Sequence, residues 1–112
     1  MTIDNLTIGD IKQLQSLFTG NVSTLQPYEI GKAYLIRSVT HIDIGIVKAV
    51  GDKEIVLSNA SWIADTGRYH DALKGGTAKL NEVEPYIDDV IINRSAVVDA
   101  TVWRHPCPDQ QK

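Results

Sequence analysis

The sequence contains a single cysteine, Cys107, in 112 residues. A secreted protein of this size normally carries an even set of cysteines paired in disulfides, so one thiol favours a reducing compartment. The N-terminus lacks the basic segment and apolar run of a signal peptide. No apolar stretch approaches the ~18–20 residues needed to cross a membrane. The sequence therefore predicts a cytoplasmic protein with no membrane contact.

Basic residues do not outnumber acidic ones. The chain has 11 Lys and Arg against 14 Asp and Glu, which gives a formal net charge of −3. Long nucleic acids bind mainly through neutralisation of phosphates by a basic surface. We therefore expect no extended DNA or RNA binding, whereas a local arginine pocket for one small anion is compatible with this balance.

Recognisable catalytic and metal motifs are missing. Ser61, Asp65 and His70 can be drawn as a nucleophile, acid and base, but no nucleophile-elbow pattern surrounds the serine. The sequence has no Gly-rich phosphate loop. His105 and Cys107 have a ligand-like spacing, and they lie in the C-terminal tail. We expect no enzyme, no metal site and no cofactor.

The overall composition is that of an ordinary globular domain. Apolar residues make up 43% of the chain and charged residues 22%. A chain of this length buries about two thirds of its unfolded surface and needs no disulfide or metal staple. We therefore expect one domain over residues 1–112.

An amphipathic helix is predicted at residues 7–19. Thr7 is a good N-cap, and the carboxylate of Asp10 can reach back to the N–H of the cap. Gly20 is a suitable C-cap. The apolar stripe repeats at helical spacing and consists of Ile8, Ile11, Leu14, Leu17 and Phe18.

The segment after a polar loop predicts three strands. Residues 33–42, 44–50 and 54–63 are rich in β-branched and aromatic side chains. Gly45 predicts a bend or bulge in the second strand. A tight turn is expected at residues 51–53. Short strands joined by tight turns are typical of a barrel or sandwich.

The second half of the chain is less regular. A polar insertion at residues 64–82 is expected to include one or two helical turns at 68–74, followed by a short edge strand at 83–86. A hairpin of residues 90–92 and 95–102 is predicted around Asn93-Arg94. The barrel would then span residues 33–103, with an irregular tail at 104–112.

The order of these elements resembles an Sm-like barrel. The resemblance lies in the blocks Tyr34–Val39, Gly45–Val50, Glu54–Leu57 and Asn93–Val98. It implies a mainly β fold with an N-terminal α-helix, namely a small SH3/Sm-like β-barrel. It also implies assembly into a homo-oligomer.

A second resemblance is to a family of uncharacterised small proteins of tailed phages and prophages. Its most specific block is Trp-Ile-Ala-Asp-Thr-Gly-Arg at residues 62–68. The remaining blocks are Gly31–Arg37, Glu82–Tyr86, Asn93–Ala96 and Trp103–Pro106. The resemblance implies a viral protein located in the host cytoplasm or in the virion. It implies no particular activity.

The segment from Trp62 to His70 is the first candidate ligand site. Aromatic faces, an arginine and short polar groups are how a nucleotide base and phosphate are commonly held. The residues concerned are Trp62, Asp65, Thr66, Arg68 and Tyr69. In the alternative interpretation Trp62 is a core residue, residues 65–67 cap a short helix, and Arg68 pairs with Asp71 or a strand carboxylate.

Asn93 and Arg94 are a second candidate pair. They can supply an amide and a cation to a ligand. The alternative is a turn, which asparagine favours because it tolerates positive φ.

Three functions follow from these patterns. The first is a phage-encoded, non-enzymatic binding protein that captures a small anionic ligand, such as a nucleotide signal of host defence. The second is a virion or assembly component that binds only protein, including other phage proteins. The third is an Sm-like RNA-binding ring, which the net charge disfavours.

Overall fold

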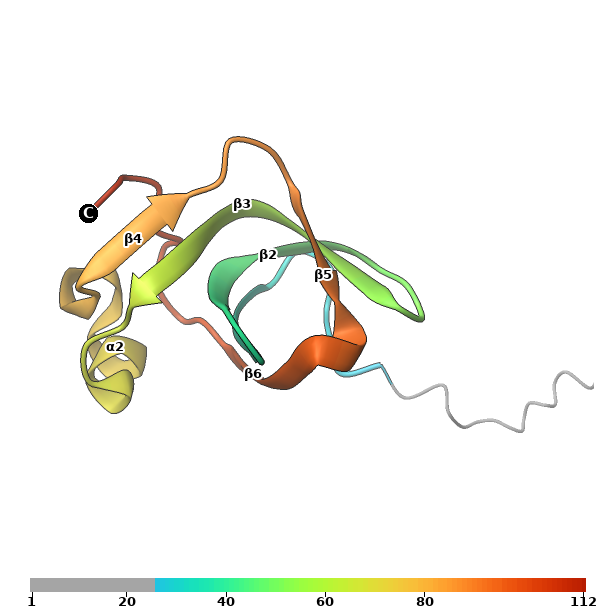
Figure 1. Ribbon diagram of the computed structural model, residues 1–112, viewed down its shortest axis with the longest axis horizontal. Helices are drawn as coiled ribbons and strands as arrows, with labels where there is room; N and C mark the ends of the chain where they lie inside the picture. The colour runs from blue at the N-terminus through green and yellow to red at the C-terminus, as the bar shows by residue number, and fades with distance from the viewer. Residues whose placement is uncertain (1–25) are drawn as a thin grey trace, which may run out of the picture.

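The computed structural model describes residues 26–112, and the helix expected at residues 7–19 lies outside them. The described chain is mainly β, with six antiparallel strands and one short α-helix (Figure 1). None of the described helices is long and apolar enough to cross a membrane.

The first three strands form an antiparallel meander. They are β1 (Ala33–Ser38), β2 (Ile42–Val50) and β3 (Glu54–Asp65). The first turn is closed by a hydrogen bond from the Ser38 N–H to the His41 carbonyl at 2.7 Å, and the second by one from Gly51 to Glu54 at 2.8 Å. These elements lie close to the three strands that the sequence predicted.

The long strand β3 bends and changes partner midway, as Figure 1 shows. Its first part pairs with β5 (Val90–Asn93) and its last part with β4 (Glu82–Pro85). At the bend the pairing with β2 shifts register around Gly45, opposite Asn59, which has φ 49°. The bulge predicted at Gly45 is confirmed.

Gly45 is required by the close approach of β3. A Cβ atom at this position would lie 2.8 Å from the Cβ of Ala60 and 3.0 Å from that of Leu57. Real Cβ atoms essentially never approach so closely. The absence of a side chain therefore lets the bulged strand pass directly over β2.

The predicted hairpin around Asn93-Arg94 is wrong. β5 pairs with β3, whereas β6 (Val97–Val102) pairs with β1. A three-residue 3-10 turn, η5 (Arg94–Ala96), joins them. The side chain of Asn93 accepts a hydrogen bond from the Ser95 N–H, which favours this tight helical turn over a two-residue hairpin. β5 and β6 follow each other in the sequence but lie at opposite ends of the strand order β5-β3-β2-β1-β6.

The segment between β3 and β4 folds as two short helices. They are α2 (Tyr69–Gly75) and the 3-10 helix η4 (Gly76–Lys79). Ala72 of α2 and Leu80, which follows η4, are both buried. These helices lie beside the paired ends of β3 and β4 (Figure 1).

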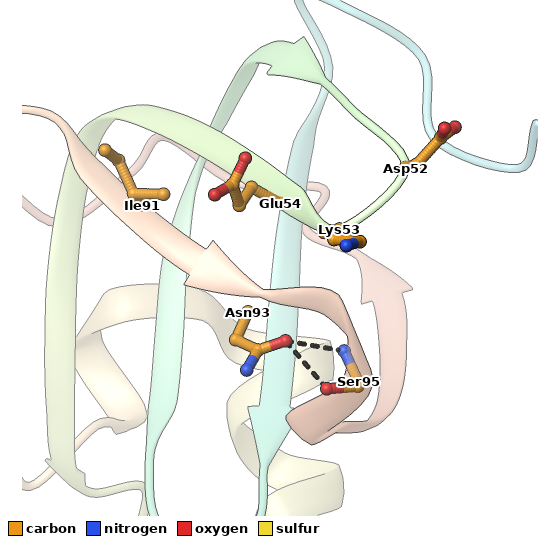
Figure 2. A pocket seen from close by; sticks show the side chains of 6 residues that line it. All are labelled: Asp52, Lys53, Glu54, Ile91, Asn93 and Ser95. Carbon is orange, nitrogen blue, oxygen red and sulfur yellow. Dashed lines mark hydrogen bonds between the residues drawn. The ribbon is translucent and has the colours of Figure 1, made fainter.

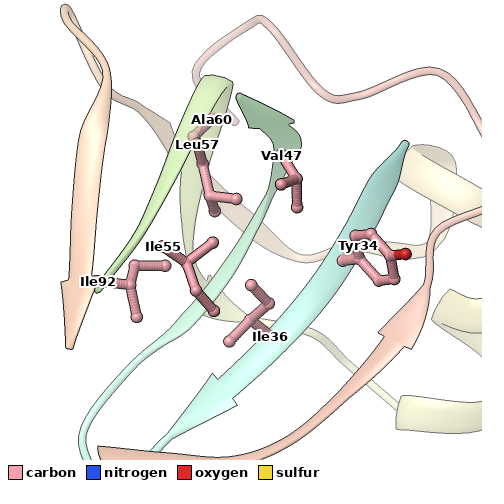
Figure 3. Packing of buried hydrophobic residues seen from close by; sticks show 7 residues of the cluster. All are labelled: Tyr34, Ile36, Val47, Ile55, Leu57, Ala60 and Ile92. Atoms are coloured by element: carbon pink, nitrogen blue, oxygen red, sulfur yellow. The ribbon is translucent and has the colours of Figure 1, made fainter. Parts of the chain in front are cut away.

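Apolar residues are buried on both faces of the sheet. The inner core, drawn in Figure 3, consists of Tyr34, Ile36, Val47, Ile55, Leu57, Ala60 and Ile92. The outer core consists of Leu35, Ile44, Ile63, Ala72, Leu80, Val83 and Trp103. Neighbouring residues of one strand alternate between the two cores because successive side chains point to opposite faces.

The tail at residues 104–112 has no helix or strand, as predicted, but it is firmly bonded to the domain. The Ser61 hydroxyl, which is buried, donates to the Pro108 carbonyl at 2.9 Å. The backbone of Lys112 exchanges two hydrogen bonds with that of Val83 in β4, at 3.0 and 3.1 Å. The tail therefore covers an edge of the sheet.

Candidate functional site

Trp62 is partly exposed, so its interpretation as a core residue is wrong. Its side chain is 39% exposed, whereas Trp103 is 3% exposed and belongs to the outer core. The His41 ring lies beside it, with ring centroids 5.8 Å apart. An exposed indole held on a rigid strand offers a flat face to a partner.

The residues after Trp62 form a turn before α2. The Asp65 carboxylate accepts a hydrogen bond from the Gly67 N–H at 2.8 Å, and the Thr66 hydroxyl donates to the Gly67 carbonyl at 2.9 Å. Arg68 is the N-cap residue of α2, which has no side-chain cap. Asp65 and Thr66 thus stabilise the turn at Gly67 and do not cap α2.

The Arg68 side chain is exposed. In the part of the chain that the structure describes, its guanidinium makes no hydrogen bond or ion pair, and the predicted pairing with Asp71 is not seen. Arg68 therefore stands apart from the other cations near this segment.

Tyr69 is engaged with a different arginine. The guanidinium of Arg37 lies 4.5 Å from the centre of the Tyr69 ring and forms a bidentate ion pair with Asp99. The hydrogen bond from Arg37 lowers the pKa of Asp99 below its usual value. Asp99 thus balances the charge of Arg37, which stands over the ring of Tyr69.

Asn93 and Arg94 lie at the opposite end of β3 from Trp62. Asn93 pairs with Glu54, the first residue of that strand. The guanidinium of Arg94 donates to the Gly51 carbonyl at 2.7 Å and lies over the ring of Tyr28. These contacts support the turn interpretation, and the predicted site residues do not come together in one place.

The most unusual polar side chain is one that the sequence patterns did not single out. Asp43, the second residue of β2, is 5% exposed. Its Oδ1 accepts a hydrogen bond from the Tyr86 hydroxyl at 2.8 Å. Burial raises the pKa of Asp43, although this hydrogen bond and nearby His41 act in the opposite direction. Buried carboxylates are uncommon unless they are paired.

Asp43 stands in a row of side chains on the inner face of the sheet. Directly paired residues of antiparallel strands share a face. Asp43 pairs with Ile36 on one side and with Trp62 on the other, and Trp62 pairs with Glu84. A carboxylate, an indole and a second carboxylate therefore follow one another across β2, β3 and β4.

Asp43 and Tyr86 line a recess of about 250 Å³ beside the inner core. We call it the Asp43 pocket. Its further lining residues are Ser38, His41, Val90, Ile91, Ile92, Asn93 and Ala96. Burial and the hydrogen bond to Asp43 both raise the pKa of Tyr86, so its phenol stays protonated and donates.

A larger recess of about 570 Å³ lies where the β2–β3 turn faces β5 and the residues after it (Figure 2). Its lining mixes both charges and consists of Asp52, Lys53, Glu54, Ile91, Asn93 and Ser95. The Asn93 side-chain oxygen in this recess is occupied by Ser95 through two hydrogen bonds. The recess therefore has fewer polar groups available for a ligand than its lining suggests.

Residues 26–112 contain no group of three or more His, Cys, Asp or Glu side chains that could hold a metal ion. His105 instead lies 2.8 Å from the Leu73 carbonyl through its Nε2 and packs edge-on against Trp103.

No family model, curated protein or solved structure matches this chain.

Proposed function

We propose that this chain is a phage-encoded, non-enzymatic binding protein that recognises another protein through the Asp43 pocket and Trp62. The observation that carries the proposal is an exposed tryptophan on a rigid strand, directly paired with a buried carboxylate that lines a recess. Aromatic anchors beside a pocket are typical of protein-binding surfaces. The protein then acts as a virion or assembly component, in the host cytoplasm or in the particle.

We also infer that the sheet closes as a small SH3/Sm-like barrel. The outermost strands of the path, β5 and β6, follow each other directly through η5. The Val39 N–H donates to the Ala96 carbonyl at 2.9 Å, which joins the β1–β2 turn to η5. Both features support closure around the inner core.

Photo-crosslinking tests the proposed function. His41→benzoylphenylalanine places a reactive group at the edge of the pocket and keeps Trp62, and Lys74→benzoylphenylalanine places the same group on the exposed side of α2. We expect a protein adduct at position 41 and none at position 74, in the cells that naturally produce the chain. Equal labelling at both positions, or none at either, would contradict the proposal.

A nucleotide-type anion is a second candidate ligand. The supporting observation is the exposed Arg68 guanidinium, which has no partner among the residues that the structure describes. An arginine of this kind can clamp a phosphate bidentately. Trp62 would offer a face to the base, but its row neighbours Asp43 and Glu84 are acidic and repel an anion.

Arg68→Ala separates this candidate from a scaffold role. We expect the melting temperature to stay unchanged, because exposed residues without partners alter stability by at most about 0.5 kcal/mol. The affinity for a nucleotide retained by the purified protein, identified by native mass spectrometry, should fall by about one to two decades. A lower melting temperature with unchanged nucleotide affinity would show that Arg68 has a structural role only.

A further inference from the structure

Among residues 26–112, the Asp43 carboxylate accepts one side-chain hydrogen bond. The Tyr86 hydroxyl occupies Oδ1, and no other described residue donates a hydrogen bond to the carboxylate. A buried carboxylate oxygen without a donor is costly, so a site that keeps one gains free energy when a donor arrives. The second oxygen, Oδ2, can therefore accept a hydrogen bond that the described residues do not supply.

The charged groups around Asp43 favour a positively charged donor. The lining of the Asp43 pocket contains no lysine or arginine, and its one basic residue is His41. Glu84 adds a second carboxylate to the same row, and its Oε1 accepts a hydrogen bond from Gln111 at 3.1 Å. Trp62 stands between the two carboxylates in this row, and Tyr86 is hydrogen-bonded to Asp43. Carboxylates beside aromatic rings suit a cation, because aromatic faces attract positive charge.

The size of the pocket limits the ligand. Sites for whole small molecules occupy roughly 300–1,000 Å³. The Asp43 pocket has about 250 Å³, which suits one side chain and not a nucleotide.

We propose that the Asp43 pocket binds the ammonium or guanidinium group of a lysine or arginine side chain presented by a protein partner. The cation donates to Oδ2 of Asp43 beside Tyr86, and Trp62 lies next to the pocket, against the His41 ring that lines it. This assignment rests on the proposed function and adds the chemistry of the group that is recognised.

Nuclear magnetic resonance of the full-length ¹⁵N-labelled chain tests the assignment. The probes are the peptides acetyl-Gly-Lys-Gly-amide and acetyl-Gly-Arg-Gly-amide at millimolar concentration. Matched neutral probes carry norleucine or citrulline in place of the cation. We expect saturable shifts of the Asp43 and Tyr86 amides and of the Trp62 indole with the cationic peptides only.

Two variants with the same change in net charge make the test specific. Asp43→Asn keeps an acceptor for Tyr86 and should weaken cation binding by about one to two decades. Asp71→Asn, on exposed α2, should leave binding unchanged. A well-dispersed spectrum of each variant shows that it is folded.

Equal shifts with the neutral peptides, or no shifts with the cationic ones, would overturn the assignment. Shifts of the same resonances by inorganic phosphate would also overturn it. In each case a crosslink at position 41 would still support the proposed function. Cation binding without any crosslink would instead refute the proposed protein partner and keep the chemistry of the pocket.

Discussion

Asp43 is a carboxylate whose ionised form the fold disfavours, because burial raises its pKa. The folded state then holds the proton more tightly than the unfolded state. Stability must therefore fall as the pH rises from about 4, the usual aspartate value, through the raised pKa. Residues that lower the stability of the free protein are typical of functional sites.

Asp43→Asn should consequently raise the melting temperature at neutral pH. The amide oxygen still accepts from Tyr86, and the buried charge is gone. The gain should shrink as the pH is lowered to about 4 and level off below it, where the wild-type carboxyl becomes protonated in the unfolded state as well. Circular dichroism melts across this range measure it, and a less stable variant at neutral pH would contradict the role of burial.

Gly45→Ala should destabilise the protein by about 1–3 kcal/mol, the usual cost of forcing a methyl group into a packed interior. The added Cβ would meet the Cβ atoms of Ala60 and Leu57. Gly51→Ala is the matched control, because its Cβ would lie 3.6 Å from the Glu54 carbonyl oxygen, an ordinary contact. Urea unfolding of both variants decides the point, and equal losses would show that the bulge tolerates a side chain.

At the scale of elements, the C-terminal tail is the clearest case of an irregular segment with a structural role. Its Pro108 carbonyl accepts from buried Ser61, and its Pro106 carbonyl accepts from the Trp103 indole N–H at 3.2 Å. Removing an acceptor from a buried donor costs roughly 1–3 kcal/mol. The tail therefore holds the outer core in place.

Deleting residues 105–112 should lower stability by about 2–6 kcal/mol, the sum of two such losses. Ser61→Ala provides a control, since it removes the donor that the deletion leaves unpaired. The substitution should cost less in the truncated chain than in the full one, which a double-mutant cycle of thermal or urea unfolding measures. Additive effects would refute a direct role for the Ser61–Pro108 bond.

Local sequence patterns predicted the elements better than their partners. Alternating β-branched residues and tight turns define β1, β2 and β3, and Gly45 indicated the bulge. Nothing local distinguishes a hairpin from the 3-10 turn that sends β6 to β1 and leaves β5 on β3. The pairing of a strand depends on which distant edge is free.

The candidate site shows the same limit. The exposed aromatic and polar residues near Trp62 were found because they follow one another in the sequence. Asp43 was missed because it fell in the break between the predicted strands 33–42 and 44–50, where a single aspartate looks like an ordinary turn residue. Its significance comes from Tyr86, which lies 43 residues away and meets it only in the folded sheet.

At the scale of the whole molecule, we expect a homo-oligomer. Strands β5 and β6 are joined through η5 and not by a ladder, and each pairs with one strand in the described chain, so each keeps one edge for pairing between subunits. Ile91 on β5 and Val98 on β6 are both largely exposed. Light scattering at micromolar concentration should give at least twice the mass of one chain.

Charged substitutions at these edges test the interface. Ile91→Lys or Val98→Lys should lower the measured mass, because lysine on an edge strand opposes pairing. Ile30→Lys, at an exposed position outside the strands, should not. A wild-type protein with the mass of a single chain would exclude the ring assembly.

The two cores on opposite faces of one sheet leave the chain open to slipped pairing. In a sheet with one wet face, a slip of one residue drags apolar side chains into water and is strongly penalised. Here the neighbours Leu35 and Ile36 are both apolar and are buried on opposite faces. A slip of β1 by one residue would therefore move apolar side chains from one core into the other and leave few of them in water. Misaligned hairpins are therefore competitors during folding.

Gly45 removes much of this ambiguity. It is flanked by Ile44 and Ile46, so moving β2 by one residue against β3 would push an isoleucine into Ala60, at a distance where even a methyl group clashes. Burial of apolar side chains is similar in both alignments, whereas only one of them places a residue without a side chain opposite Ala60. The correct alignment of this sheet is thus selected by sterics at one point, and errors in refolding are to be sought in that first three-stranded unit.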